Sequence, residues 1–328
     1  MIKTHVIDAG SRYGIHPSWE SVKELIEFDL FEVDKTENDR LKKKYRNSPN
    51  VNCHNMALWS ESGPLNFNIT KHKGLITTLT PDKDYLQKTE YWQDEWQVEG
   101  VFQIQATTID TLAQEKSIHF LKLDTEGSEL QILKGGVNTI QNSVLGIRCE
   151  VFFTPCLENV PLFGEIDEFM RTQGFELLNL DYRGKGAAQS AFADPEAYGK
   201  LVSSDGVWIR PIREIFSGPT ENVVENVLRL SLFLLLNSAS DLAVNLLCNS
   251  TKKGITFANY EEDPLFLNIK RKIQLLFKKL SYLPSMSLIE IDKTNQQIFG
   301  EKFPTLNRFW ESDEDLIPPH TEWTMQKG

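Results

Sequence analysis

The segment from Phe120 to Gly136 holds the densest set of residues that could act in chemistry. It reads as an apolar strand that ends at Asp124, followed by a turn that contains Glu126 and then by a helix. In an open α/β sheet, ligands bind beyond the carboxyl ends of the strands. A carboxylate placed there can take a proton from a reacting hydroxyl or hold a cationic group. We therefore expect Asp124 and Glu126 to be the catalytic residues.

A second strand end lies in Asp8-Ala-Gly-Ser-Arg-Tyr-Gly14. Its glycines are spaced Gly-x-x-x-Gly, so the dinucleotide fingerprint Gly-x-Gly-x-x-Gly is missing and NAD is disfavoured as a cofactor. Glycine allows a sharp turn and a close approach of ligand to backbone, and a helix predicted from Pro17 would present free N–H groups to an anion. Glu32 ends the next strand, where a carboxylate that binds ribose hydroxyls is expected. Asp34 is expected in a solvated turn.

Two charged residues, Lys122 and Glu150, interrupt strands that otherwise read as buried on both faces. A buried charge needs a partner. Because the two strands are expected to be neighbours, an ion pair between Lys122 and Glu150 that fixes the sheet is the leading interpretation. The alternative pairs Lys122 with Asp124, which lies on the same side of its strand. Spacing alone identifies no third carboxylate beside Asp124 and Glu126, so we predict that no metal is required.

Strand and helix patterns alternate from residue 4 to about residue 210. Strands are expected at 5–8, 28–33, 51–58, 120–124, 144–153, 175–180 and 206–210, and helices at 17–27, 36–45, 128–135 and 161–173. This alternation predicts an α/β fold with a doubly wound, mostly parallel sheet. Residues 61–107 break the pattern, with strands at 63–69 and 101–107 around a polar loop at 81–100. We interpret them as an insertion over the ligand edge, and we expect a further loop at 183–200.

Composition narrows the function classes. The chain has 328 residues, 40% of them apolar, which suffices for one large core and a second smaller unit. A net charge of -11 gives no general attraction to nucleic acid or anionic lipid, so neither is an expected partner. The four cysteines show no Cys-x-x-Cys pair and read as reduced. The first strand begins too close to Met1 for a signal peptide, so a cytoplasmic location is expected.

Taken together, these blocks resemble the FkbM family of S-adenosylmethionine (SAM) dependent methyltransferases. The resemblance rests on the segments 8–14, 31–34, 55–58, 108–112 and 124–130, and it covers roughly residues 4–210. It implies a class I, Rossmann-like methyltransferase that uses SAM to methylate a hydroxyl of a sugar, a glycan or a secondary metabolite. It also implies a set of cofactor-binding residues: Asp8, Gly10, Ser11, Arg12, Gly14, Glu32, Asn55 and Ala57. His16 and His54 are weaker candidates for contact with cofactor or acceptor.

Beyond the resemblance, residues 212–328 read as a helical C-terminal region of unknown role, so we predict domains at 1–211 and 212–328. The apolar run within 226–249 is interrupted by Arg229 and Asn237 and is too short and too polar to span a bilayer. Residues 266–282 read as an amphipathic helix. The alternative function is a non-catalytic SAM-binding or partner-binding module that acts through this region, and a homo-oligomer is possible.

Overall fold

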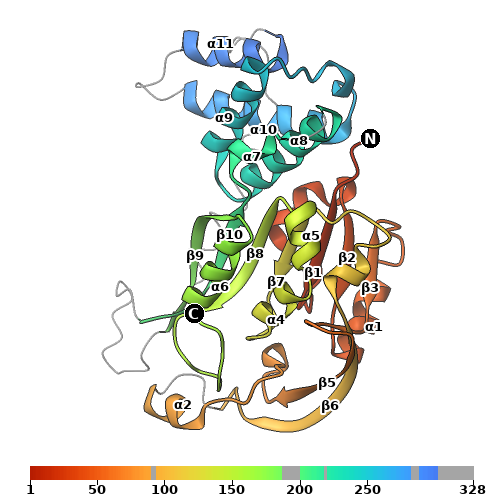
Figure 1. The fold of residues 1–328 in the computed structure, drawn as a ribbon, viewed down its shortest axis with the longest axis vertical. Coiled ribbons are helices and arrows are strands. Elements are labelled where there is room, and N and C mark those ends of the chain that lie inside the picture. The colour runs from red at the N-terminus through yellow and green to blue at the C-terminus, as the bar shows by residue number, and fades with distance from the viewer. Residues whose placement is uncertain (90–93, 187–199, 218–219, 282–287, 302–328) are drawn as a thin grey trace. The chain divides into compact units, whose positions relative to one another are not determined.

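A computed structural model describes residues 1–89, 94–186, 200–217, 220–281 and 288–301 (Figure 1). Its residues form two compact units. The sheet unit contains Lys3–His16 and Ile26–Glu214, and the helical unit contains Met1–Ile2, Pro17–Leu25 and the described residues from Ile215 onward. The domain boundary between residues 211 and 212 stays a prediction.

The sheet unit is built on seven strands in the order β3-β2-β1-β7-β8-β10-β9. The first five strands run parallel, and β10 runs antiparallel to both β8 and β9. This confirms the doubly wound, mostly parallel α/β sheet. The bounds are β1 His5–Ala9, β2 Glu27–Phe31, β3 Val51–His54, β7 Phe120–Leu123, β8 Gly146–Phe152, β9 Glu176–Gly186 and β10 Lys200–Ile209.

Helices cover the sheet and bury its apolar strands. Asp34 caps α1 at its first turn, because its carboxylate accepts hydrogen bonds from the backbone N–H groups of Thr36 and Glu37. Asp34 is therefore a helix cap and not the solvated turn residue expected. The helices between strands are α1 Lys35–Lys44, α3 Ile109–Leu112, α4 Glu129–Lys134, α5 Val137–Asn142 and α6 Phe163–Thr172, and α7 Ile212–Ile215 follows β10.

The predicted insertion forms a small second sheet in the order β4-β6-β5. Its strands are β4 Ala57–Leu58, β5 Gly63–Thr70 and β6 Val98–Thr107, and the short helices η2 Lys73–Leu75 and α2 Lys83–Thr89 lie between β5 and β6. Two expectations were wrong here. The strand predicted at 51–58 divides into β3 and β4, which belong to different sheets, and the loop predicted at 81–100 contains α2.

The helix predicted from Pro17 is a 3₁₀ helix, η1 Pro17–Leu25, which groups with the helical unit. Trp19 is buried within that unit, where its ring lies 5.9 Å from the ring of Phe233. The buried apolar residues of η1 therefore belong to the helical unit. Most of the loop predicted at 183–200 lies outside the described residues.

The helical unit contains α8 Thr220–Leu236, α9 Ser240–Lys252, η3 Ala258–Tyr260, α10 Pro264–Ser281 and α11 Leu288–Phe299. Helix α10 buries Ile269, Ile273 and Phe277, as its amphipathic pattern predicted. Arg229 is buried in α8 and donates a 2.6 Å hydrogen bond to Glu225. Among the residues that the structure describes, no helix has the length and apolar content that a membrane crossing requires.

One buried carboxylate ties three strands of the sheet unit to the turn before β7. Asp29 on β2 lies 2.7 Å from His5 Nε2 on β1 and 2.7 Å from His54 Nε2 on β3, and the Lys116 ammonium also contacts it. Burial alone would raise the pKa of Asp29, but these hydrogen bonds outweigh it and hold the pKa well below its ordinary value. The ionised form of Asp29 therefore stabilises the folded state.

We expect Asp29→Asn to lower the free energy of unfolding by about 3 kcal/mol at pH 7, the scale for breaking a buried ion pair. A carboxylate with a depressed folded-state pKa contributes stability above its unfolded pKa, and that contribution falls as acid protonates it. Below about pH 4, the difference between wild type and Asp29→Asn should therefore shrink by up to about 1.4 kcal/mol per pH unit.

Urea unfolding at pH 7 and at pH 3 measures this difference. Asp39→Asn, which changes an exposed carboxylate on α1, is the matched control and should have a much smaller effect at both pH values. A wild type to Asp29→Asn difference that is the same at pH 7 and pH 3 would contradict the assignment.

Candidate cofactor and active site

A cavity of about 240 Å³ opens at the carboxyl ends of β1, β2 and β7. Gly10, Glu32 and Asp124, each just beyond one of these strands, lie in its wall. The insertion completes the wall with Phe67 and the segment from His72 to Ile76. The cavity thus lies where the strand ends of a doubly wound sheet place a ligand.

The glycine loop is fixed by close packing of the backbone. Gly10 has a φ of +76°, and a Cβ atom there would lie 1.7 Å from the carbonyl oxygen of Asp124. Gly14 has a φ of +98°, and its Cβ would lie 2.4 Å from the Tyr45 hydroxyl. Both positions therefore require glycine. From the sequence, Gly10 was expected to leave space for a ligand. In the structure it leaves space for the backbone of Asp124, which excludes any side chain at position 10.

Lys122 joins the glycine loop to the end of β7. It is 6% exposed, and its Nζ lies 3.3 Å from Asp8 Oδ1 and 3.2 Å from Asp124 Oδ2. It also donates a 3.3 Å hydrogen bond to the carbonyl oxygen of Gly10. Burial lowers the pKa of Lys122, but the carboxylates of Asp124 and Asp8 outweigh burial and leave the pKa above its ordinary value. Lys122 is therefore charged.

The ion pair predicted between Lys122 and Glu150 is wrong, and the strand register gives the reason. Lys122 pairs in register with Asp8 on one side and with Arg148 on the other. Glu150, two residues beyond Arg148, is therefore level with Asp124. Arg148 takes a different carboxylate, since its Nε donates a 2.8 Å hydrogen bond to Asp205. The alternative pairing of Lys122 with Asp124 is the one that the structure contains.

Glu32 places a poorly solvated carboxylate in the cavity wall. It is 5% exposed, and its Oε1 accepts a 2.8 Å hydrogen bond from the backbone N–H of Asp34. Burial raises the pKa of Glu32 to about 7, against the smaller lowering effects of the Asp34 N–H and of Arg12. Hydroxyl groups that donate hydrogen bonds to this carboxylate would stabilise its charged form.

The predicted cofactor residues divide into two groups. Gly10, Arg12, Glu32 and Ala57 line the cavity, as do the predicted catalytic residues Asp124 and Glu126. The other four residues are not among those that line the cavity and instead contact neighbouring residues. Asp8 contacts Lys122, Ser11 donates to the carbonyl oxygen of Phe31, Gly14 packs on Tyr45, and the Asn55 amide donates to the carbonyl oxygens of Glu32 and Val33.

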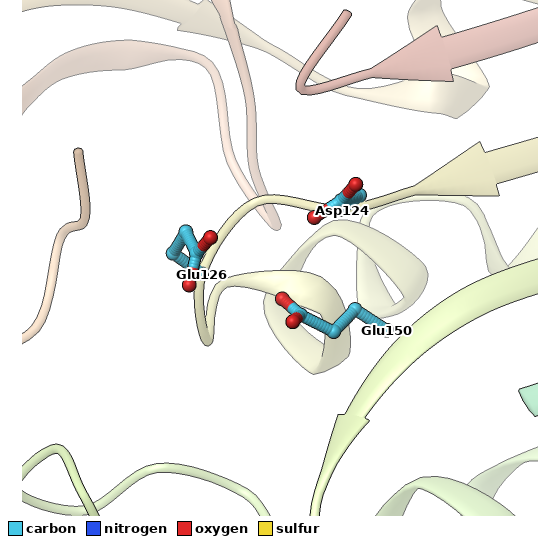
Figure 2. Close-up of side chains that lie close together, drawn as sticks. All are labelled: Asp124, Glu126 and Glu150. Carbon is cyan, nitrogen blue, oxygen red and sulfur yellow. The ribbon is translucent and has the colours of Figure 1, made fainter. Parts of the chain in front are cut away.

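Three carboxylates converge at the acidic end of the site (Figure 2). Asp124 follows β7, Glu126 lies in the next turn, and Glu150 lies on β8; one oxygen from each lies within 4.8 Å of the other two. Glu126 has a φ of 57°, and its carbonyl oxygen accepts a 2.6 Å hydrogen bond from Thr77 Oγ1 of the insertion. Burial, and then the neighbouring carboxylates, raise the pKa values of Glu126 and Glu150 well above the ordinary glutamate value.

Glu129 lies near this cluster, but its carboxylate has a structural role. Its Oε1 accepts hydrogen bonds of 2.6 Å and 2.8 Å from the backbone N–H and the hydroxyl of Thr125. Burial raises the pKa of Glu129 to about 7, while its own backbone N–H and Thr125 lower it. These bonds close the turn between β7 and α4.

Sequence reasoning missed two parts of the site. Glu150 was read as a partner for Lys122, whereas the register of β7 and β8 places it level with Asp124. The insertion wall, with Phe67 and the segment from His72 to Ile76, carries no motif that would identify it. His54, a weaker candidate for ligand contact, instead stacks on Phe31 at 4.7 Å and bonds to Asp29.

Comparison with known proteins identifies the family. A model described as "Methyltransferase FkbM domain" matches residues 8–177, which is more than half of the chain. No curated protein sequence gives a match. The chain therefore belongs to the FkbM methyltransferase family, and its fold is the Rossmann-like class I methyltransferase fold.

Solved structures similar to this chain include methyltransferase FkbM from Methylobacillus flagellatus KT, at 12% identity and a TM-score of 0.38. That similarity covers 63% of this chain and 43% of the other, so this chain spans less than half of that protein. Magnesium protoporphyrin IX methyltransferase from Synechocystis PCC 6803, solved with bound SAM, is 10% identical over 63% and 69% of the two chains, with a TM-score of 0.27. The 23S rRNA methyltransferase ErmE is 11% identical over 76% and 82%, with a TM-score of 0.29.

The packing of Gly10 generates a direct test. We expect Gly10→Ala to displace the strand ends of β1 and β7, because its Cβ cannot coexist with the Asp124 carbonyl oxygen. The variant should lose S-adenosylhomocysteine binding in calorimetry and should unfold at a lower temperature than wild type. Gly164→Ala on α6 is the control, since nothing lies within 4 Å of its added Cβ. Wild-type binding and stability in Gly10→Ala would show that the two backbones are not packed in this way.

Proposed function

We propose that this member of the FkbM methyltransferase family transfers the methyl group of SAM to a hydroxyl of a sugar, a glycan or a secondary metabolite. The observation that carries the proposal is the cavity at the carboxyl ends of β1, β2 and β7, whose wall contains the buried Glu32 and the carboxylates of Asp124 and Glu126. Apolar side chains line the same cavity.

The apolar part of the wall suits the adenine of the cofactor. It is formed by Phe31, Met56, Leu58, Phe67 and Ile76. Glu32, which ends β2, would accept hydrogen bonds from the ribose hydroxyls, and such bonds offset the cost of its burial. Arg12, whose Nη1 lies 3.1 Å from Asp34 Oδ2, is a cation in the same wall and suits the carboxylate of the methionine part.

The acidic part of the wall suits the reacting centre. SAM carries a positive sulfonium, and carboxylates at Asp124 and Glu126 would stabilise it by charge. When SAM is bound, it supplies an activated methyl group, so the chain's own residues mainly align the acceptor and favour the loss of its proton. We assign this work to Asp124, with Glu126 in support, because both line the cavity and Lys122 fixes the Asp124 carboxylate.

The acceptor is proposed to be a small molecule or a glycan. A net charge of -11 and an acidic site would repel the phosphates of a nucleic acid. NAD remains disfavoured, because the glycine loop lacks the dinucleotide spacing. In addition, the carboxylates of Glu32, Asp124 and Glu126 in the cavity wall do not suit a negatively charged pyrophosphate.

The high pKa of Glu32 predicts that cofactor binding depends on pH. Only the charged carboxylate accepts two hydroxyl hydrogen bonds well, so S-adenosylhomocysteine affinity should fall by up to about 10-fold from pH 8 to pH 6, for a group that titrates near pH 7. Glu32→Gln should bind more weakly at pH 8, by about 1 to 3 kcal/mol. It should also lose most of this pH dependence.

Calorimetric titrations of wild type and Glu32→Gln at both pH values provide the measurement. Arg12, Asp34 and Glu37 are the charged groups that influence Glu32. Asp8, whose pKa burial raises to about 6, titrates in a similar range but is present in both proteins. Equal affinity of wild type and Glu32→Gln at pH 8 would remove Glu32 from the ribose site.

Asp124 is tested by turnover with an acceptor found in a screen of sugars and glycans. Asp124→Asn should lower the turnover number by roughly 100-fold or more, the usual scale for loss of acid or base function, with little change in cofactor affinity. If Asp124 holds the methyl donor instead, affinity and turnover should fall together. Asp39→Asn is the control for a surface carboxylate, and wild-type turnover in Asp124→Asn would refute both roles.

A further inference from the structure

We propose that Asp124, Glu126 and Glu150 form a binding site for a hard divalent cation such as Mg²⁺ or Mn²⁺. The three residues come from the end of β7, the turn that follows it and the adjacent strand β8, so neighbouring parallel strands bring them together (Figure 2). One carboxylate oxygen from each lies within 4.8 Å of the other two. This proposal departs from the sequence-based prediction that no metal is required, which stays a prediction.

A second observation points to a ligand at the cluster. The Oε2 atom of Glu150 is buried, and the described part of the chain gives it no hydrogen-bond partner. Figure 2 shows the Glu150 side chain extending from β8 toward the turn that carries Glu126. A desolvated carboxylate oxygen with no donor is costly. A bound cation would provide the interaction that the protein does not.

The charge balance around the site leads to the same inference. Lys122 contacts Asp8 and the Oδ2 atom of Asp124, and Arg148 is engaged by Asp205. Among the residues that the structure describes, no lysine or arginine forms an ion pair with Glu126 or Glu150. Within the described residues, the cluster therefore has more carboxylates than cationic partners, and a divalent cation would offset that imbalance.

The donor set selects the class of cation. All three groups offer carboxylate oxygens, which are the ligands of hard cations and not of thiolate-seeking or imidazole-seeking metals. Oxygens on opposite sides of Mg²⁺ are about 4.2 Å apart and those on opposite sides of Ca²⁺ about 4.8 Å, from their usual bond lengths. Three oxygens that lie within 4.8 Å of one another can converge on one such cation when the side chains adjust. With three protein ligands, further positions stay open to water or to an acceptor oxygen.

The role that we assign to this cation in catalysis rests on the proposed function. The presence of a cation-binding site does not. A hydroxyl oxygen that binds the cation becomes more acidic. Its proton passes to water, and the oxygen lone pair then forms the new C–O bond as the bond from the methyl carbon to sulfur breaks and its electrons stay on sulfur. Asp124 and Glu126 would then act on the acceptor by holding the cation.

Binding of Mn²⁺ tests the site without knowledge of the acceptor. The full chain, freed of metal by a chelator and then of the chelator, is titrated with Mn²⁺ while the electron paramagnetic resonance signal of free Mn²⁺ is followed. We expect one Mn²⁺ per chain, displaced by Mg²⁺. Glu150→Gln should weaken binding by roughly 10-fold or more, since even residues that only orient a metal ligand contribute 10 to 100-fold to affinity. Glu115→Gln, an exposed glutamate before β7, should bind like wild type.

Failure of folded wild type to bind Mn²⁺ would overturn the inference, as would equal affinity in Glu150→Gln and wild type. Thermal unfolding checks that each variant is folded, and Glu126→Gln replaces Glu150→Gln if the latter is not. A parallel titration with S-adenosylhomocysteine separates the two proposals. Cofactor binding without Mn²⁺ binding overturns only the cation site, and Mn²⁺ binding without cofactor binding overturns only the proposed function.

Discussion

The rest of the site depends on one buried cation. Lys122 lies between Asp8 and Asp124, opposite Asp8 in the register of β1 and β7, and it also donates to the carbonyl oxygen of Gly10. An ammonium buried among apolar strands is tolerated only where carboxylates surround it. This contact fixes the glycine loop and the end of β7 against each other. Removal of the lysine would leave the buried carboxylate of Asp8 without this cation.

The contacts of Lys122 help to explain how the chain accommodates several carboxylates close together. Lys122 neutralises part of the charge of Asp8 and Asp124, and Arg148 neutralises Asp205. Glu129 is stabilised by the Thr125 hydrogen bonds. Beyond these pairs, the turn after β7 adds Glu126 and strand β8 adds Glu150, and the described residues include no lysine or arginine that forms an ion pair with either. The carboxylates of Asp124, Glu126 and Glu150 favour positively charged ligands, which is consistent with a sulfonium cofactor and with a bound divalent cation.

Much of the fold could be predicted from sequence because its signals are local. Apolar runs that end in acid or glycine marked β1, β2 and β7, and their parallel order placed Gly10, Glu32 and Asp124 at one edge. What failed depends on contacts distant in sequence. The pairing of Lys122 follows from strand register, which apolar runs do not specify. Likewise, the pattern after Pro17 shows that an apolar face exists but not which unit buries it.

The insertion shows the same limit. Its strands β5 and β6 were predicted from alternating residues, yet their contribution of Phe67 to the cavity wall comes from the way the small sheet lies over the strand ends. Asp34 gives a smaller example, because the hydrogen bonds that make it a helix cap were not evident from composition. In both cases the residue type was compatible with several roles, and tertiary packing selected one.

The central claim is that the cavity at the ends of β1, β2 and β7 holds SAM. A crystal structure of the chain with S-adenosylhomocysteine tests it most directly. We predict density for the ligand in this cavity, with the ribose hydroxyls at Glu32, the adenine against Phe31 and the sulfur facing Asp124. Density for the ligand at another place, or an empty cavity at saturating ligand, would contradict the account.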